Sequence, residues 1–370
     1  MDKRLRSIEV REASFEDYSQ IVQLQSRHGL AEKNTLHEWR HLWVDNPVYR
    51  QLSKTWPVGW VLEDRNRKIA GYIGNIPLSY EFKGERLLAA TGRAWVVDAQ
   101  YRGYSLLLMN RFLAQTSVDL YINTTLNALA FEGFRLFGAL PVPVGDWDVS
   151  RFWVTNPAGF LTSSLAVKGI PLVKPLSYFF AVPLLVNDHL NRWRFIRNER
   201  RADVQFCSGF DERFDAFWEE LRRKRSHVLM GARSREVLDW HFGPALSANR
   251  VWIFCVADGR RLLAYSIFCR QDNELRRIRL ADFQSLTDDN SLLLPMLSCA
   301  VKRCRRMGIN VLEIIGLRAE KAELIQTLSP YRRKLPSWRS FYKARDPQLA
   351  ESLKNWNVWD PSLFDGDSSL

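Results

Sequence analysis

The sequence predicts a mixed α+β protein made of two similar domains. The chain has 370 residues, more than the roughly 150 residues of an average domain. Segments that alternate like strands and segments with helical periodicity follow one another along its length. Strand patterns of the first half also return in the second: Trp252 lies 192 residues after Trp60, and Val311 lies 193 residues after Val118. A duplicated fold explains this repetition.

Composition indicates a well-packed protein with anionic partners. Hydrophobic residues make up 46% of the chain and aromatic residues 12%, which excludes a disordered protein. The formal net charge of +12 favours a phosphorylated cofactor, nucleic acid or an anionic membrane surface, without choosing among them.

The cysteines indicate neither a disulfide framework nor a zinc site. All five lie in the C-terminal half, and no two have CxxC spacing. The first residues lead into strand-like sequence rather than into an apolar signal core. We therefore expect a cytoplasmic protein that holds no metal.

The segment 160–186 is apolar and aromatic enough to be compared with a membrane span. Lys168 and Lys174 interrupt it, together with four glycine or proline residues. A span needs about 20 uninterrupted apolar residues. We expect packing between the two domains, with contact at a membrane surface as the alternative, and no transmembrane span.

The first half opens with an alternating strand at 8–13 and a helix capped by Ser14. A hairpin follows, in which strands at 60–62 and 69–73 pair across a polar turn. The remaining elements are expected in this order: a strand at 78–82, a turn at 83–84, a strand at 87–98, a helix at 106–114 and a strand at 118–124.

The most informative stretch is the end of the strand at 87–98 and the start of the next helix. Gln100, Gly103 and Ser105 stand there at spacings 0, 3 and 5. A helix N-terminus presents unpaired backbone N–H groups and a partial positive charge, so it can hold the pyrophosphate of coenzyme A. Gly103 lets the backbone approach that ligand closely, and the Ser105 hydroxyl adds a donor.

This stretch resembles the Gln/Arg-x-x-Gly-x-Gly/Ala motif of the GNAT superfamily of N-acetyltransferases, with Ser105 in place of the usual Gly or Ala. Further along, Asn127, Ala130 and Gly138 match the pattern Asn-x-x-Ala-x-x-x-Tyr-x-x-x-Gly of the same superfamily, and Phe134 takes the Tyr position. The resemblance implies two tandem GNAT-like acyl-CoA N-acyltransferase domains, each a central, mostly antiparallel sheet flanked by helices.

In the superfamily this Asn contacts the pantetheine or phosphate region of acyl-CoA, and the Tyr often protonates the leaving thiolate. The resemblance therefore places Asn127 and Phe134 at the cofactor. Phenylalanine has no proton to donate, so the usual general acid is missing. Acetyl-CoA, or another acyl-CoA, remains the expected co-substrate.

The resemblance further implies that the pantetheine arm adds to the strand at 87–98 like an extra strand. The backbone at Val96 and Val97 is then expected to hold the arm and polarise the thioester. Asp98 is the nearest ionisable group and the candidate general base, with a capping role as the alternative. The other expected acyl-CoA contacts are Tyr101, Arg102 and Tyr104. The first two of these alternatively belong to a solvated loop.

The second half lacks the phosphate-binding loop. Residues 285–291 stand in its place, and Asp288 with Asp289 would repel a pyrophosphate. We therefore expect the second domain to shape the acceptor site or to support the first, as in FemAB-like transferases. The expected organisation is a first domain at 1–150, a connecting segment at 151–205, a degenerate second domain at 206–350 and a tail at 351–370.

Two other motifs have plain structural explanations. Residues 37–41 fit the His-Glu-x-x-His pattern of zinc proteases, but no third ligand follows, and this helix is expected to pack over the acceptor mouth. The cations and rings of 331–343 could bind single-stranded nucleic acid. A hairpin that closes the second domain explains them as well, and we expect the hairpin and no nucleic-acid partner.

The expected activity is transfer of an acetyl or other acyl group from acyl-CoA to an amine, either an amino sugar or another small metabolite. A non-catalytic acyl-CoA-binding scaffold is the first alternative, because Phe134 replaces the usual acid. An aminoacyl-tRNA-dependent transferase is the second, because the charge of +12 suits tRNA. The acceptor, the acyl length and the oligomeric state do not follow from the sequence.

Overall fold

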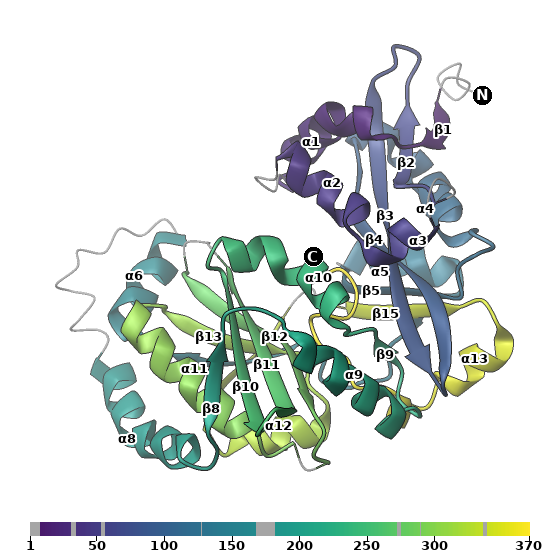
Figure 1. The fold of residues 1–370 in the computed structure, drawn as a ribbon. Helices are drawn as coiled ribbons and strands as arrows, with labels where there is room; N and C mark the ends of the chain where they lie inside the picture. The colour runs from purple at the N-terminus through teal and green to yellow at the C-terminus, as the bar shows by residue number, and fades with distance from the viewer. Residues whose placement is uncertain are drawn as a thin grey trace.

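In a computed structural model, the chain forms two mixed sheets with helices against their faces, and the two halves lie side by side (Figure 1). The structure describes residues 8–30, 35–52, 56–126, 128–167, 182–271, 275–288, 290–335 and 339–370. The predicted α+β fold of two similar domains is confirmed.

The first sheet has the strand order β1, β2, β3, β4, β5, β15, β6, and β9 pairs with β3. Its strands are β1 (Glu9–Glu12), β2 (Gly59–Glu63), β3 (Ile69–Phe82), β4 (Glu85–Val97), β5 (Leu120–Leu126), β6 (Leu140–Pro141), β9 (Met230–Gly231) and β15 (Arg339–Ala344). The helices of this half are η2 (Phe15–Asp17), α1 (Tyr18–Arg27), α2 (Leu36–Val44), α3 (Pro47–Leu52), η3 (Ala99–Tyr104), α4 (Ser105–Leu113), α5 (Ala128–Leu136) and α13 (Pro347–Ser352).

The second sheet has the strand order β14, β7, β13, β12, β11, β10, β8. Its strands are β7 (Val149–Val154), β8 (Val204–Cys207), β10 (Val251–Asp258), β11 (Arg261–Gln271), β12 (Arg277–Ser285), β13 (Val311–Ile315) and β14 (Tyr331–Lys334). The remaining helices are α6 (Pro157–Val167), α8 (Val182–Glu199), α9 (Glu212–Lys224), α10 (Arg235–Ser247), α11 (Leu293–Met307), α12 (Ala319–Gln326) and η4 (Trp356–Val358).

The expected hairpin at 60–73 is confirmed as the antiparallel pair β2–β3. The strands expected separately at 69–73 and 78–82 form a single strand, β3, although Gly74, Asn75 and Pro77 are residues typical of a turn. The side-chain amide of Asn75 forms its hydrogen bonds outside the strand, because its Nδ2 donates to the Pro57 carbonyl and to the Gln115 side chain, both at 2.9 Å. Side-chain bonding thus lets a turn-like sequence remain in a strand.

The two halves repeat one plan. In each, three antiparallel strands are followed by a helix and then by a strand parallel to the third. In the first half the parallel pair is β4 and β5, and in the second it is β12 and β13. Both third strands also contain a bulge, β4 opposite Tyr72–Gly74 and β12 opposite Ile267–Phe268. The repetition expected from the sequence is therefore present in strand order, strand direction and irregularity.

Strands also cross between the halves: besides the short β9, which pairs with β3, one longer strand of each half joins the sheet of the other. β7 lies between β13 and β14 in the second sheet, and β15 pairs with β5 in the first, where the end of the chain lies beside the middle of the first half (Figure 1). The hairpin expected at 331–343 is therefore wrong, because β14 and β15 lie in different sheets. Alternation of apolar and polar residues predicts a strand but not its partner. The exchange also crosses the expected division at residue 150, which falls inside β7.

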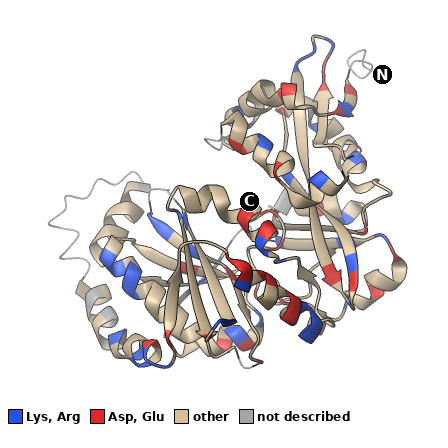
Figure 2. Ribbon diagram, in the orientation of Figure 1, with Lys and Arg blue, Asp and Glu red and all other residues tan. Residues whose placement is uncertain are grey.

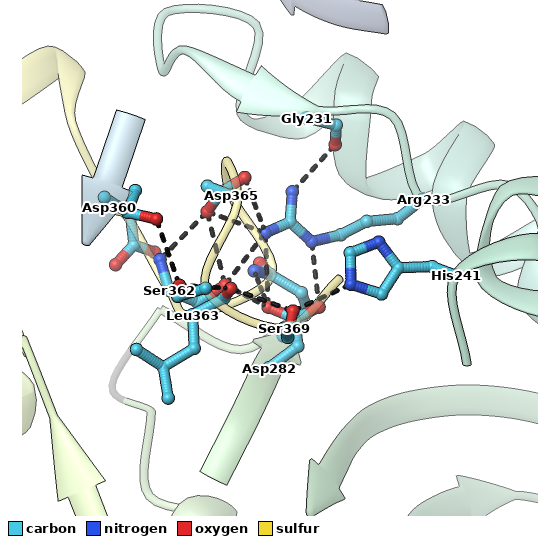
Figure 3. Close-up of polar contacts among 12 residues, drawn as sticks. Gly231, Arg233, His241, Asp282, Asp360, Ser362, Leu363, Asp365 and Ser369 are labelled. Carbon is cyan, nitrogen blue, oxygen red and sulfur yellow. Dashed lines mark hydrogen bonds and ion pairs between the residues drawn. The ribbon is translucent and has the colours of Figure 1, made fainter. Parts of the chain in front are cut away.

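The tail at 356–370 is held by buried ion pairs. Asp360 accepts from Lys321 at 2.7 Å and from Arg225 at 2.6 Å. Further along, the backbone N–H of Phe364 donates to the Ala281 carbonyl in β12 at 2.9 Å. Figure 3 shows the next contacts, in which Arg233 lies against Asp365 and His241 points to Ser369. These contacts hold the tail against the second half, and its last residues reach the first half, where Asp367 accepts from the Thr124 N–H at 2.7 Å.

Among the helices that the structure describes, none has the length and apolar character that crossing a bilayer requires. Of the apolar segment 160–186, residues 168–181 lie outside the described part.

Candidate active site

The predicted phosphate-binding stretch is an exposed turn at the end of β4. A 3-10 turn, η3, stands between the strand and α4, whereas the sequence predicts a loop that leads directly into the helix. Gln100, Arg102 and Gly103 are exposed there, and Tyr101, Tyr104 and Ser105 are half-buried. A Cβ atom placed on Gly103 would meet no other atom within 4 Å. The backbone at this glycine is therefore open to an approaching ligand, as the motif requires.

Asp98 connects this turn to the end of α1. Its Oδ2 accepts from Arg27 at 2.9 Å, and its Oδ1 lies 2.9 Å from the His28 Nε2. Burial raises the pKa of Asp98, but the bonds with His28 and Arg27 outweigh it and hold this pKa below its ordinary value. A carboxylate in such pairs is a weak proton acceptor. The catalytic role of Asp98 stays a prediction, and its contacts match the alternative structural role.

The strands β4 and β5 diverge beyond their first residues. Their parallel pairing joins only Ala89 with Leu120 and Ala90 with Tyr121 within the described residues. Farther along, the Asn123 side chain fills the widening gap: its Nδ2 donates to the Gly92 carbonyl at 2.6 Å, and its Oδ1 accepts from the Gly92 N–H at 3.2 Å. Past this bridge, up to Val96 and Val97, β4 has no strand partner on the side of β5 among the described residues.

A bulge at Ala94 turns β4 at the same point. Ala94 has a φ of 54°, in the left-handed region that non-glycine residues seldom adopt. Strain of this kind persists where surrounding structure fixes it, commonly at functional sites. Next to it, the buried Trp95 Nε1 has no hydrogen-bond partner among the described residues. An orphaned donor beside an open strand edge fits a ligand with acceptor groups, such as the amides of a pantetheine arm.

Phe134, at the position of the superfamily tyrosine, is a core residue. Only 3% of it is exposed, and its ring lies 5.9 Å from that of Phe341 in β15, nearly parallel to it. It also contacts Trp95 and Phe112 edge to face. Its neighbour Gly133 leaves room for the Trp95 ring, 3.1 Å from where a Cβ would lie. Asn127, the other residue of this motif, lies outside the described residues.

A cavity of about 420 Å³ lies between the two halves and reaches the divergent strands. Ala94 of β4 and Thr125 of β5 both line it. One wall is aromatic, with Tyr18, Trp39, Trp43 and Tyr72 from α1, α2 and β3. The opposite wall is polar and comes from the second sheet and the tail: Gln271, Arg279, Asp367, Ser368 and Ser369. The cavity thus combines an aromatic wall from the first half with a polar wall from the second half and the tail, at the point where β4 and β5 are unpaired.

Sequence reasoning missed the charged groups of this cavity. Arg93 donates to the Leu370 carbonyl oxygen at 2.5 Å. Asp367, the one carboxylate side chain among the described residues that line the cavity, accepts from the Thr124 N–H at 2.7 Å and from the hydroxyls of Thr124 and Thr125. The acidic tail is far from β5 in sequence, so no local pattern signals that Asp367 lies at the end of that strand.

The His-Glu-x-x-His helix serves packing and capping. Glu38 accepts from the Thr35 N–H at 2.7 Å and thereby caps α2. The His41 Nε2 lies 2.8 Å from the Trp240 carbonyl, and its Nδ1 lies 2.8 Å from Asp45. Trp39 and Trp43 of the same helix line the cavity, and the expectation that this helix covers an acceptor mouth stays a prediction. Within the described residues, no group of three His, Cys, Asp or Glu side chains has a metal-binding arrangement.

Comparison with solved structures identifies the fold. A Saccharomyces cerevisiae N-myristoyltransferase with bound myristoyl-CoA superposes with a TM-score of 0.56 at 11% identity, over 91% of this chain and 79% of that one. A GCN5-related N-acetyltransferase from Anabaena variabilis gives a TM-score of 0.53 at 12% identity, over 92% of this chain and 73% of that one. A probable N-acyltransferase from Enterococcus faecalis gives 0.55 at 12%, over 91% and 72%.

By sequence, no family model and no curated protein matches the chain. The structural similarity nevertheless extends over nearly its whole length, including both sheets. Together with the divergent β4 and β5, the bulge and the open glycine turn, it leads to one conclusion: this chain has the GNAT fold.

Proposed function

We propose that the chain is an acyl-CoA-dependent N-acyltransferase. The observation that supports this most directly is that the cavity between the halves opens onto the bulged, divergent part of β4 and β5. An extended ligand arm added to that edge would end beside Ala94, at the cavity. An acyl donor and an amine acceptor would thereby meet in one place, which is the main requirement of a direct transfer.

In this proposal the residues of the first half hold the donor. The exposed turn with Gln100, Arg102 and Gly103, followed by α4, receives the pyrophosphate. The backbone of Val96 and Val97 supports the pantetheine arm, and the Trp95 Nε1 supplies a donor within the gap. Acetyl-CoA is the first donor to test, and longer acyl-CoAs follow.

The acceptor amine enters from the cavity and must lose a proton before or during attack. Asp367 is the candidate for this task, because it lines the cavity and accepts hydrogen bonds from the neutral donors of Thr124 and Thr125, whereas Asp98 faces α1 and is paired with the cationic Arg27. Phe134 cannot return a proton to the thiolate. We propose Asp367 as the base and a small-molecule amine as the acceptor.

The test is calorimetric titration of acetyl-CoA into the wild type and into Gly103→Glu. The new carboxylate would stand where the pyrophosphate is proposed to bind, and the open surroundings of Gly103 mean that the fold tolerates the side chain. Gly145→Glu is a matched control, since Gly145 is equally unobstructed. Binding that is lost in Gly103→Glu and kept in Gly145→Glu supports the donor site. Absence of binding to a folded wild type, for acetyl-CoA and longer acyl-CoAs alike, overturns it.

A non-catalytic acyl-CoA-binding protein is the second candidate, because Phe134 is buried in the core. Binding without release of free thiol across a panel of amines would favour that candidate. The charge distribution gives less support to a tRNA-dependent transferase than to these two candidates. In the view of Figure 2, Lys and Arg lie on both halves and are interspersed with Asp and Glu. Salt-sensitive binding of tRNA would reverse this preference.

A further inference from the structure

Three arginines converge on one buried carboxylate in the second sheet. Glu313 is fully buried, and its oxygens accept from the Arg277 Nη1 at 3.1 Å, the Arg279 Nε at 2.8 Å and the Arg333 Nη2 at 2.5 Å. The Ser150 hydroxyl adds a fourth bond at 2.7 Å. Burial raises the pKa of Glu313, but Arg279 and the other arginines outweigh it and lower this pKa to about 2, so the carboxylate is charged.

Counted over the described residues, the cluster nevertheless has a positive excess, since three guanidinium charges face the Glu313 carboxylate. A carboxylate that binds several guanidinium groups fixes their positions and so prepares them for another anion. The buried Arg277 Nε also lacks a hydrogen-bond partner among the described residues. Arg279 has its pKa lowered, first by burial and then by repulsion from Arg277 and Arg333, although Glu313 opposes this.

This cluster reaches the acceptor cavity through Arg279. Arg277 and Arg279 stand two residues apart on β12, so both side chains lie on one face of the sheet. On the neighbouring strand β11, Cys269 pairs with Arg279 and Gln271 pairs with Arg277. Arg279, Cys269 and Gln271 all line the cavity. The face that bears the arginine cluster is therefore the second half's wall of the cavity.

We propose that this wall is a subsite for an anionic group, a carboxylate or a phosphate, on the amine acceptor. The proposal rests on the proposed function and specifies its substrate class. In the part of the chain that the structure describes, the cavity is also lined by Arg93 and by one acidic side chain, Asp367, which accepts hydrogen bonds from Thr124 and Thr125. The positive charge of Arg279 stands across from the aromatic wall, so the favoured acceptor combines a ring or apolar body, an amine and an acidic substituent.

Calorimetry with three related amines tests the subsite. All three share an amino-sugar ring. Glucosamine bears no acidic group, glucosamine 6-phosphate bears a phosphate, and muramic acid bears a carboxylate. At constant ionic strength we expect at least one acidic sugar to bind the wild type about tenfold or more tightly than glucosamine, as one charge-assisted bond allows. The variant Arg279→Gln should lose this advantage. Which acidic sugar binds tells a phosphate-bearing acceptor from a carboxylate-bearing one.

Four comparisons make the test decisive. Arg261→Gln removes an equal charge from an exposed arginine and should keep the advantage. Arg279→Lys retains the positive charge and should keep most of the affinity advantage of the acidic sugar. A purely structural role of Arg279 predicts instead that Arg279→Lys and Arg279→Gln lose this advantage equally. Acetyl-CoA binding by Arg279→Gln should equal that of the wild type, which shows that the variant is folded. Gly103→Glu should keep the advantage, because it alters only the donor turn.

Equal affinity of the wild type for all three sugars, or an advantage that survives Arg279→Gln, overturns the subsite. Loss of the advantage in Gly103→Glu also overturns it, because the anion would then bind at the donor turn. Failure of the proposed function has a different signature, namely the absence of acyl-CoA binding by the wild type.

Discussion

The guanidinium of Arg233 lies against the carboxylate of Asp282, with 2.9 Å between Nε and Oδ2 and at most 1% of either side chain exposed. Asp365 of the tail lies 3.1 Å from the same guanidinium. The Ser362 hydroxyl and the Tyr265 phenol donate to Asp282 as well. One buried cation, in the segment between β9 and α10, therefore ties that segment to β12 and to the tail (Figure 3).

Replacing Arg233 with methionine is expected to destabilise the fold severely. Asp282 and Asp365 would be left buried without their cation, which typically costs about 3–5 kcal/mol. Urea unfolding measures the loss. The exposed Arg261→Met should change stability by less than about 0.5 kcal/mol. A loss near that of the control would show that the buried network contributes little.

Mild acid is expected to weaken the attachment of the tail through His241. Burial lowers the pKa of His241 to about 3, and its Nε2 lies 2.7 Å from the Ser369 hydroxyl. The unfolded chain, with an imidazole pKa near 6.5, binds a proton first, so stability falls as the pH drops below about 6.5. The loss between pH 7 and pH 5 should be about 2 kcal/mol.

The variant His241→Gln identifies the residue responsible, because glutamine does not titrate. Its unfolding free energy should vary less between pH 7 and pH 5 than that of the wild type. His37→Gln, at an exposed position, should keep the wild-type slope. Identical slopes in all three proteins would contradict the assignment.

Asn123→Ala is expected to destabilise the first half. The side chain satisfies both backbone groups of Gly92 in the gap between β4 and β5, and each buried group left unpaired costs about 1–3 kcal/mol. Chemical unfolding should show a loss of about 2 kcal/mol or more, and acetyl-CoA binding should weaken as the gap changes shape. Asn110→Ala, at an exposed position of α4, should alter neither. Unchanged stability of Asn123→Ala would mean that water replaces the amide without cost.

The two candidate bases give opposite expectations. Asp367→Asn should lower kcat about 100-fold or more, as loss of a general base does. Asp98→Asn should change kcat little, since that carboxylate is paired with Arg27 and His28 and does not line the cavity. Both variants should bind acetyl-CoA. A large loss of kcat in Asp98→Asn alone would restore Asp98 as the base.

Local sequence patterns predicted most of the first half and the repetition of its plan in the second. Hydrophobic alternation and turn residues identify a strand wherever its neighbours are near in sequence, as for β2 and β3. The GNAT motif around Gly103 could be found for the same reason. The FemAB-like arrangement of the two domains and the limits of each domain stay predictions.

The pairing of strands that are far apart in the chain could not be predicted from local sequence patterns. Tyr331–Lys334 and Arg339–Ala344 are adjacent strands that a hairpin would explain, yet they join different sheets. Partner choice depends on surfaces formed by distant segments: Phe341 meets Phe134, a residue some 200 positions earlier, and that contact has no local signature. Asp367 and Arg279 were missed similarly, because the cavity exists only once the tail and the second sheet lie against the first half.

The hydrogen bond from the Phe364 N–H to the Ala281 carbonyl distinguishes the second half from the first. Ala281 is the bulge residue of β12, and the corresponding bulge of β4 is where the acyl-donor arm is proposed to end. In the second half a peptide of the same chain occupies that edge, like a permanent substitute for a ligand. The residues that follow it, 367–370, line the acceptor cavity. The tail therefore both completes the second sheet and shapes the cavity, so a substitution near Phe364 should alter binding of the proposed acceptor without touching it.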